Sequence, residues 1–297
     1  MKNKLAYYIV LFCVLTACKK LEVDSVDFDV TTEKNTYSLG DTVTFHFNGE
    51  PDYLLFYSGE TGAKYQFRNR IEEAGEPIMN FTSLKTGNSS AKIELLISSD
   101  CTGVYEKSVV KSATWNDLTT NAVFSTGADN TPSGNISLKA YQDASRPVYL
   151  AFKSSKPADN LNQVFAHSIK TLNIQNILSD GSIHSINPGT NLQGWKNVDS
   201  LLSAIAWSVN SSNQLNISSI TANANEANED WAISGAIDLS KAIPDKARTI
   251  KSMAMVMPPK FEHVFAQRGT YKVSFVAYNQ TSKDKKEVVK EFEIHIN

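Results

Sequence analysis

Residues 261–279 read FEHVFAQRGTYKVSFVAYN, and this stretch decides the fold class predicted for the chain. Between Tyr271 and Ala277 apolar side chains recur at every second position, with more polar residues between them. A period of two is typical of a half-buried β-strand. The stretch therefore predicts a strand, a turn at Gly269 and a second strand, which together would form a hairpin near the C-terminus.

The same alternation occurs near the other end of the chain. Residues 42–48 read TVTFHFN, which predicts a strand with Val43, Phe45 and Phe47 on one face. His46 then lies on the outward face, where a structural role is expected rather than a catalytic one. Apolar content of 41% and charged content of 20% are those of a globular protein, and strand and turn formers dominate. An all-β protein is predicted.

The C-terminal stretch resembles the last hairpin of PKD domains, immunoglobulin-like β-sandwiches with the pattern H-x-F/Y, a Gly turn, then Y-x-V-x-F-x-A-x-N. Residues 28–67 resemble the first half of the same module. The resemblance implies a PKD/Ig-like sandwich split into residues 28–80 and 258–297, because neither half alone could cover its apolar faces. The alternative is two tandem domains, the first complete by about residue 84.

The residues between these two halves carry a different set of motifs. Residues 91–98 (AKIELLIS), an S-x-D-x-x-G turn and the A-x-W-x-D-L run at 113–118 occur in an order that resembles galactose-binding-like jelly rolls. The motif EDWAIS at 229–234 is similar to a jelly-roll signature, which implies that Trp231 is an interior strand residue. The resemblance implies an inserted jelly-roll domain over residues 81–257.

A further signature, FYSGE-x-G-x-x-Y-x-x-R-x-R at residues 56–70, resembles a family of Bacteroidetes surface lipoproteins of undefined function. Arg68 and Arg70 alternate with their neighbours in this signature. They would either bind a carboxylate or sugar hydroxyls of a ligand, or pair with nearby carboxylates such as Glu60 and Glu73.

The first residues predict a lipoprotein signal peptide over residues 1–17. Lys2 and Lys4 precede an apolar run that is too short for a transmembrane helix, and LTAC then fits the lipobox L-x-[AGS]-C. An ordinary secretory signal is the alternative. Resemblance to lipoproteins implies that Cys18 is acylated, that residues 18–27 form a tether, and that outer-membrane lipid holds the protein. A location on the cell exterior is expected, with a periplasmic orientation left open.

Charge and cysteine content exclude some partners. With 29 basic and 31 acidic residues and no basic tract, nucleic acid is not an expected partner. Once Cys13 leaves with the leader and Cys18 is acylated, only Cys101 remains, so no intramolecular disulfide is expected. Cys101 is interpreted as a buried thiol.

The sequence contains no recognised catalytic motif: G-x-S-x-G, H-E-x-x-H, C-x-x-C and phosphate-binding fingerprints are all missing. We therefore expect no enzyme, with a hydrolase built on a carboxylate pair as the less favoured alternative. No cofactor is expected. Jelly rolls often hold a structural Ca²⁺ through loop oxygens, but Asp100, Asp129, Asp143 and Asp238 lie in no ligand-spaced motif.

Binding of extracellular glycan for a polysaccharide-uptake system is the predicted function, with proteins of that system as further partners. The predicted ligand-binding residues are Trp195, Asn197, Asp199 and Trp207, because indole rings stack on sugars and amide or carboxylate groups bind hydroxyls. Residues 198–207 also carry apolar residues at the spacing of a short amphipathic helix. A protein-binding scaffold or adhesin is the alternative function.

Overall fold

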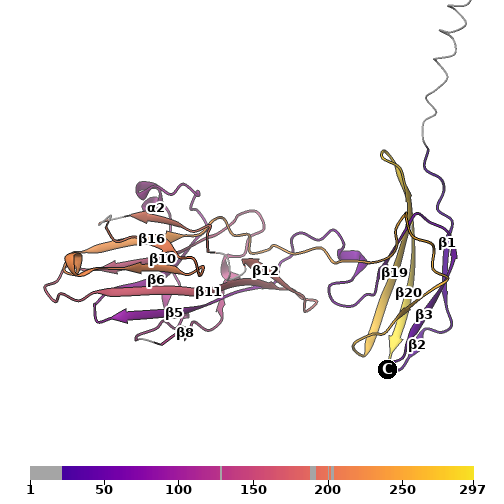
Figure 1. The fold of residues 1–297 in the computed structure, drawn as a ribbon, viewed down its shortest axis with the longest axis horizontal. Coiled ribbons are helices and arrows are strands. Elements are labelled where there is room, and N and C mark those ends of the chain that lie inside the picture. Colours follow the sequence, from indigo (N-terminus) through magenta and orange to yellow (C-terminus); the bar gives the residue numbers. More distant parts are fainter. Residues whose placement is uncertain (1–21, 128, 188–191, 200, 202–203) are drawn as a thin grey trace, which may run out of the picture. The chain divides into compact units, whose positions relative to one another are not determined.

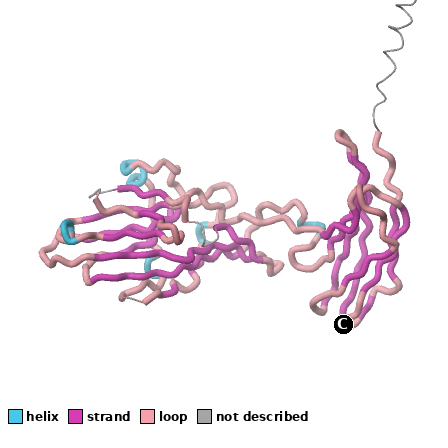
Figure 2. The backbone as a smooth tube through the Cα atoms, in the orientation of Figure 1, coloured by secondary structure: helices cyan, strands magenta, loops and turns pink. Residues whose placement is uncertain are grey.

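A computed structural model describes residues 22–127, 129–187, 192–199, 201 and 204–297. Strands make up most of the regular structure in this part of the chain, and the helices are short, as Figure 2 shows. The all-β prediction is confirmed. None of the helices in these ranges has the length and apolar character needed to cross a membrane. The predicted signal peptide and Cys18 lie outside the described residues.

The chain divides into two compact units. The first combines the residues up to Asn69 with Pro244–Asn297, and the second is continuous over Arg70–Ile243. Both boundaries differ from the predicted positions at residues 80 and 258. The reason is strand pairing: residues 76–80 begin a strand of the second unit, and residues 248–251 form a strand of the first.

In its described part, the first unit contains two sheets (Figure 1). The three-stranded sheet has the order β1 (Phe28–Thr32), β3 (Val43–Gly49), β18 (Lys260–His263). The five-stranded sheet has the order β17 (Arg248–Lys251), β4 (Tyr53–Tyr57), β19 (Gly269–Gln280), β20 (Lys285–Ile296), β2 (Thr36–Tyr37). A short 3₁₀ helix, η1 (Tyr65–Phe67), follows β4. Each sheet thus combines strands from both ends of the chain.

The core of the first unit lies between its two sheets. Phe45 of β3 and Phe275 of β19 are fully buried, and their ring centroids lie 4.9 Å apart in an edge-to-face arrangement. Each such phenyl ring contributes about 1.5–3 kcal/mol by leaving water. Val43 is also fully buried and His46 is exposed, as the alternation predicts.

The two strands of residues 261–279 do not form a hairpin, which corrects the prediction. β18 pairs with β3, whereas β19 pairs with β4 and β20 in the other sheet. The alternation specified which side chains face the core, but it did not specify which strand lies alongside.

The predicted tether over residues 18–27 is also too long. Val23 is buried, and the Asn279 amide donates to the backbone carbonyls of Asp24 and Ser25. These residues therefore belong to the folded unit.

The described part of the second unit also contains two sheets. The seven-stranded sheet has the order β14 (Ser208–Val209), β15 (Leu215–Ser218), β11 (Phe165–Ile177), β5 (Glu76–Gly87), β8 (Thr131–Pro132), with β12 (Ile183–Asn187) on β11 and β9 (Ile136–Ser137) on β5. The five-stranded sheet has the order β13 (Lys196–Asp199), β16 (Asn228–Ile233), β10 (Tyr149–Lys156), β6 (Lys92–Ser98), β7 (Asn116–Asp117). The short helices are α2 (Lys107–Ser112), η2 (Thr119–Asn121), η3 (Lys139–Tyr141) and η4 (Thr221–Asn223).

The five-stranded sheet is covered on both faces. Phe152 belongs to the main core between the sheets, whereas Trp231 packs on the opposite face in a smaller cluster with Val110 of α2. Burial on both faces explains the near-continuous apolar run of β10. Trp231 is 7% exposed, in agreement with its predicted interior position. Cys101 is a buried free thiol in the same cluster.

The prediction of an amphipathic helix over residues 198–207 is wrong for residues 198 and 199, the first two that the structure describes. Residues 196–199 form β13, which pairs antiparallel with β16. Val198 is buried within this edge strand.

Candidate ligand-binding site

The two predicted tryptophans lie in the core of the second unit. Trp195 is 7% exposed and stacks on Phe152, with ring centroids 5.5 Å apart. Trp207 is 4% exposed, and its indole N–H donates to the backbone carbonyl of Asp230 at 3.1 Å. Neither indole presents an open ring face to solvent, so the predicted sugar-stacking platform does not match this geometry.

The other two predicted residues lie on β13. The Asn197 side-chain carbonyl accepts a hydrogen bond from the Trp207 backbone N–H at 2.8 Å, which ties β13 to the start of the next segment. The structure thus brings Asn197 and Trp207 together, although through a structural contact. Asp199 is the last residue of β13, and its side chain lies outside the described part of the structure.

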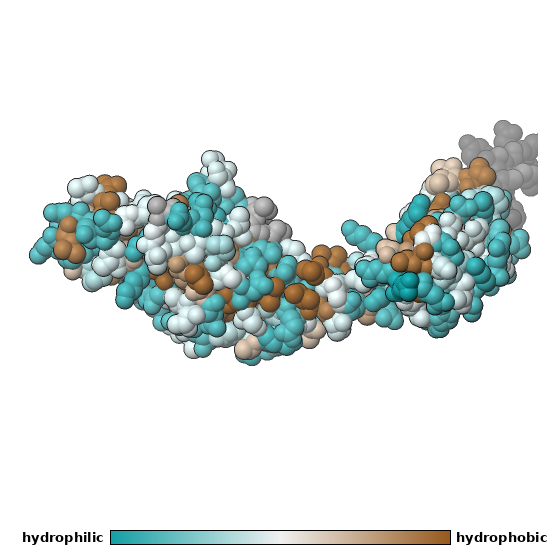
Figure 3. Space-filling model, turned by 90° about the horizontal axis from the view of Figure 1, so that it is seen from below, coloured by the Kyte–Doolittle hydropathy of each residue, from teal (hydrophilic) through white to brown (hydrophobic). Residues whose placement is uncertain are grey.

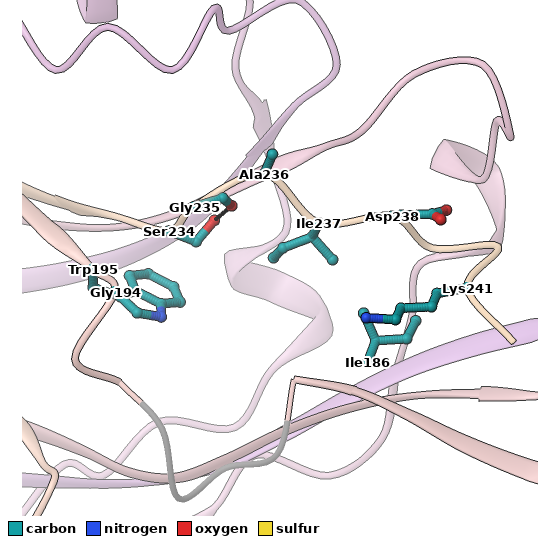
Figure 4. A pocket seen from close by; sticks show the side chains of 9 residues that line it. All are labelled: Ile186, Gly194, Trp195, Ser234, Gly235, Ala236, Ile237, Asp238 and Lys241. Atoms are coloured by element: carbon teal, nitrogen blue, oxygen red, sulfur yellow. Dashed lines mark hydrogen bonds between the residues drawn. The ribbon is translucent and has the colours of Figure 1, made fainter. Parts of the chain in front are cut away.

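A hollow opens at the edge of Trp195. It has a volume of about 300 Å³ and is lined by Ile186, Gly194, Trp195, Ser234, Gly235, Ala236, Ile237, Asp238 and Lys241 (Figure 4). The lining comes from three separate segments: the end of β12, the turn before β13, and the chain that follows β16. Of the predicted binding residues, Trp195 alone belongs to this lining.

Backbone hydrogen bonds hold these segments in place. The Trp195 N–H donates to the Leu192 carbonyl at 3.0 Å, which closes the turn that carries the indole. Ile237 exchanges two backbone hydrogen bonds with Val148, each 2.9 Å long, so the far wall is fixed to the residue directly before β10. The backbone of Lys241 pairs with that of Glu72 in an isolated antiparallel β-bridge. The wall of the hollow is therefore preformed.

The polar groups of the hollow differ in whether they are free to bind a ligand. The Ser234 hydroxyl accepts from the Leu150 N–H and donates its own hydrogen to the Gly235 carbonyl, so its hydrogen is already used. The Asp238 carboxylate accepts from the Ser240 N–H and points away from the hollow in Figure 4. The Lys241 ammonium extends toward the hollow from the side opposite Trp195. Within the described residues Lys241 has no carboxylate partner.

Two glycines leave space at the rim. A Cβ added at Gly194 or at Gly235 would meet no heavy atom within 4 Å. The hollow can therefore admit atoms of a ligand close to the backbone, and its size can be changed by substitution without a backbone clash.

Sequence reasoning missed Lys241 and the glycines of this hollow. The sequence EDWAISGAIDLS was interpreted only as a strand signature, and Lys241 follows it directly. The small residues at 235 and 236 after a buried strand were the available signal. They did not identify the opposing wall, which lies about 40 residues earlier in the chain.

A serine and a histidine elsewhere in the unit resemble a nucleophile and its base. Ser182 Oγ lies 2.8 Å from His184 Nε2 and 2.5 Å from a carboxylate oxygen of Asp180. However, His184 Nδ1 accepts the Ile243 backbone N–H, so the neutral ring carries its proton on Nε2 and donates to Ser182. A base must accept the proton of its nucleophile, and this ring cannot. Ser182 is also buried.

Arg70 completes that buried network. Its guanidinium lies 2.9 Å from Glu73 and 3.3 Å from Asp180, with the arginine side chain 5% exposed. Pairing with carboxylates of the same unit is thus the use of Arg70, one of the two alternatives that the sequence left open. Arg68 instead lies over the ring of Tyr65 in the first unit.

The carboxylates of Asp100, Asp143 and Asp238, three of the four residues considered for Ca²⁺, accept local hydrogen bonds. Hydrogen bonds from Ser145 and Arg146 lower the pKa of Asp143 to about 2. Hydrogen bonds from the Ser98 side chain and from Thr114 lower the pKa of Asp100. Over the described ranges, no three His, Cys, Asp or Glu side chains converge as a metal site would require.

Comparison with models of protein families gives a match. The family model for a domain of unknown function, DUF5017, matches residues 17–195, which is more than half of the chain. No curated protein and no solved structure matches. The matched residues include Ile186, Gly194 and Trp195 of the hollow and end at Trp195.

Proposed function

We propose that this chain, which belongs to the DUF5017 family of domains of unknown function, is a lipid-anchored cell-surface protein that binds extracellular glycan without altering it chemically. The hollow beside Trp195 is the binding site in this proposal. Acylated Cys18 would hold the protein at the outer membrane, where a polysaccharide-uptake system would supply further protein partners.

The hollow is the observation that carries the proposal. Its volume of about 300 Å³ lies at the lower end of the range for small-molecule sites, which is roughly 300–1,000 Å³. A hollow of this size suits one sugar unit, such as the end of a chain or a side branch. A whole oligosaccharide would extend beyond it.

The chemistry of the walls suits a sugar. The edge of the Trp195 indole and the side chains of Ile186 and Ile237 offer an apolar surface to sugar C–H groups. The Lys241 ammonium offers three N–H donors to hydroxyl or carboxylate oxygens. Open backbone at Gly194 and Gly235 lets a polar ligand approach peptide groups. A mainly apolar wall with few directed donors is the usual pattern of a small-ligand site.

The test uses a soluble form that begins at residue 22 and a panel of plant, host and microbial polysaccharides. Gly235→Leu would fill the hollow, and Lys241→Ala would remove its ammonium. Gly127→Leu is the matched control, because a Cβ there also meets no atom within 4 Å and Gly127 lies outside the lining. Wild type and control are expected to bind the same glycan, and both hollow variants at least tenfold more weakly.

Other outcomes lead to different conclusions. Glycan binding that is equal in all four proteins would keep the function and reject the hollow as its site. The absence of binding across the panel would reject glycan capture and favour the scaffold or adhesin alternative. Trp195→Ala and Trp207→Ala are less informative, because both indoles are buried and their loss would lower stability.

A further inference from the structure

The first unit exposes an unusually apolar loop between β17 and β18. Residues 252–257 read SMAMVM, and Met253, Met255 and Val256 are 55%, 50% and 88% exposed. On the surface seen in Figure 3, hydrophobic side chains gather in small groups among hydrophilic and neutral ones. Single exposed apolar residues are ordinary, but consecutive ones at the tip of a loop indicate a contact surface. Met257 turns back and packs against the core, so the tip itself covers nothing within the unit.

Hydrogen bonds connect the base of this loop to the first residues of the folded unit. The Lys251 ammonium donates to the Asp52 carbonyl at 3.2 Å, and the Asp52 N–H donates to the Asn279 side chain at 2.8 Å. The Asn279 amide in turn donates to the Asp24 carbonyl. Val23 is 5% exposed. The apolar loop and the entry of the N-terminal segment therefore lie at the same end of the unit.

The length of chain before this point restricts the distance to a membrane. Val23 follows Cys18 by five residue steps in the sequence. At a maximum of about 3.3–3.6 Å per residue, they span at most about 18 Å. With Cys18 acylated, the end of the unit that carries the loop would lie within that distance of the bilayer.

We propose that residues 253–256 insert into the bilayer that holds the lipid anchor, and so form a second and shallow membrane contact. The proposal rests on the anchor at Cys18 put forward above. Unbranched thioether side chains and a valine suit the boundary between headgroups and acyl chains, where apolar side chains of surface-bound segments lie. This contact would fix the first unit upright on the membrane.

The charges at this end of the unit have both signs. The basic residues are Lys251, Lys283, Lys285 and Lys286, and the acidic ones are Glu22, Asp24, Asp27, Glu50, Asp52 and Asp284. Attraction to an anionic surface would therefore be largely cancelled. The contact is consequently expected to depend on the apolar loop and to resist high salt, which screens surface charges.

The experiment uses the full chain, expressed as a lipoprotein and reconstituted in phosphatidylethanolamine–phosphatidylglycerol vesicles. Val256→Cys carries a polarity-sensitive fluorophore. Leu39→Cys is the matched control, an apolar residue that is 46% exposed at the opposite end of β20. The 12 residues of β20 span about 40 Å, and Leu39 lies at the end of this strand that is remote from the loop. Cys101 is buried and does not compete for the label.

A blue-shifted emission at position 256 that lipid-attached quenchers suppress, with water-like emission at position 39, is the expected result. High salt should leave the blue-shifted emission at position 256 unchanged. Water-like emission at position 256, while Cys18 is acylated, would overturn the inference and leave the anchor intact. A blue shift already present without vesicles would also overturn it, since the loop would then contact protein.

Acylation is measured separately, by incorporation of labelled palmitate into wild type and Cys18→Ser. If Cys18 takes up no label, the proposed anchor is rejected. Membrane insertion of the loop is then tested by vesicle flotation of the soluble form that begins at residue 22. Binding that falls at least tenfold when Met253, Met255 and Val256 are all changed to Ser would support it. Equal flotation of that variant and wild type would reject it.

Discussion

His167 should make the stability of the second unit depend on pH. It lies on β11 with 4% of its surface exposed, and its Nε2 has no hydrogen-bond partner among the described residues. Burial, with a smaller contribution from the charge of Lys85, lowers its pKa from 6.5 to about 4. The folded unit therefore holds a neutral imidazole at pH values where the unfolded chain is already protonated.

The sign and size follow from proton linkage. Between about pH 6.5 and pH 4 the unfolded state binds more protons than the folded state, so the free energy of unfolding falls as the pH falls through this window. A difference of about 2.5 pKa units corresponds to about 3 kcal/mol in total, of which about 2 kcal/mol is lost by about pH 5. Below about pH 4 the contribution of His167 levels off.

Urea unfolding followed by tryptophan fluorescence is a selective assay for this unit. The four tryptophans of the chain, Trp115, Trp195, Trp207 and Trp231, all lie within residues 70–243. His167→Leu keeps an apolar group of similar size and removes the titration. The variant should lose about 2 kcal/mol less than wild type between neutral pH and about pH 5.

Subtracting the variant's free energy of unfolding from that of wild type at each pH isolates the contribution of His167 from those of the other titrating groups. An identical pH dependence in the two proteins would refute the reasoning, because the imidazole would then be protonated in the folded unit as readily as in the unfolded chain. At neutral pH the variant should be at least as stable as wild type, since replacing a buried polar group without a partner by an apolar one is close to neutral or favourable.

Three further predictions concern stability and reactivity. Arg70→Ala should lower the stability of the second unit by about 3–5 kcal/mol in the fluorescence assay, because the buried Asp180 carboxylate loses its cation, whereas replacing Arg146 of the exposed Arg146–Asp143 pair should leave the stability nearly unchanged. Gly49→Ala should lower the calorimetric melting temperature of the first unit far more than Gly40→Ala: both have positive φ, but a Cβ at Gly49 alone would lie 2.2 Å from a backbone oxygen. Cys101 should react with a maleimide only after unfolding; rapid labelling of the native protein would contradict its burial.

The sequence by itself determined the fold class and the faces of individual strands. In β3 and β10, the alternation or continuity of apolar residues reports directly whether one face or both faces are buried. These are local properties, because each side chain direction follows from the extended backbone. The interior position of Trp231 was implied instead by the resemblance of its motif to a jelly-roll signature.

Tertiary structure alone decided which segments lie side by side. The strands of residues 261–279 belong to different sheets, and residues 196–199 join a sheet edge as a strand, because pairing depends on partners far away in the sequence. Trp195 and Trp207 were predicted to be ligand-binding residues of loops, yet both are buried in the main core of the second unit. The hollow exists because β12, the turn before β13 and the chain after β16 converge. Local periodicity carries no information about that convergence, so the site had to come from the fold.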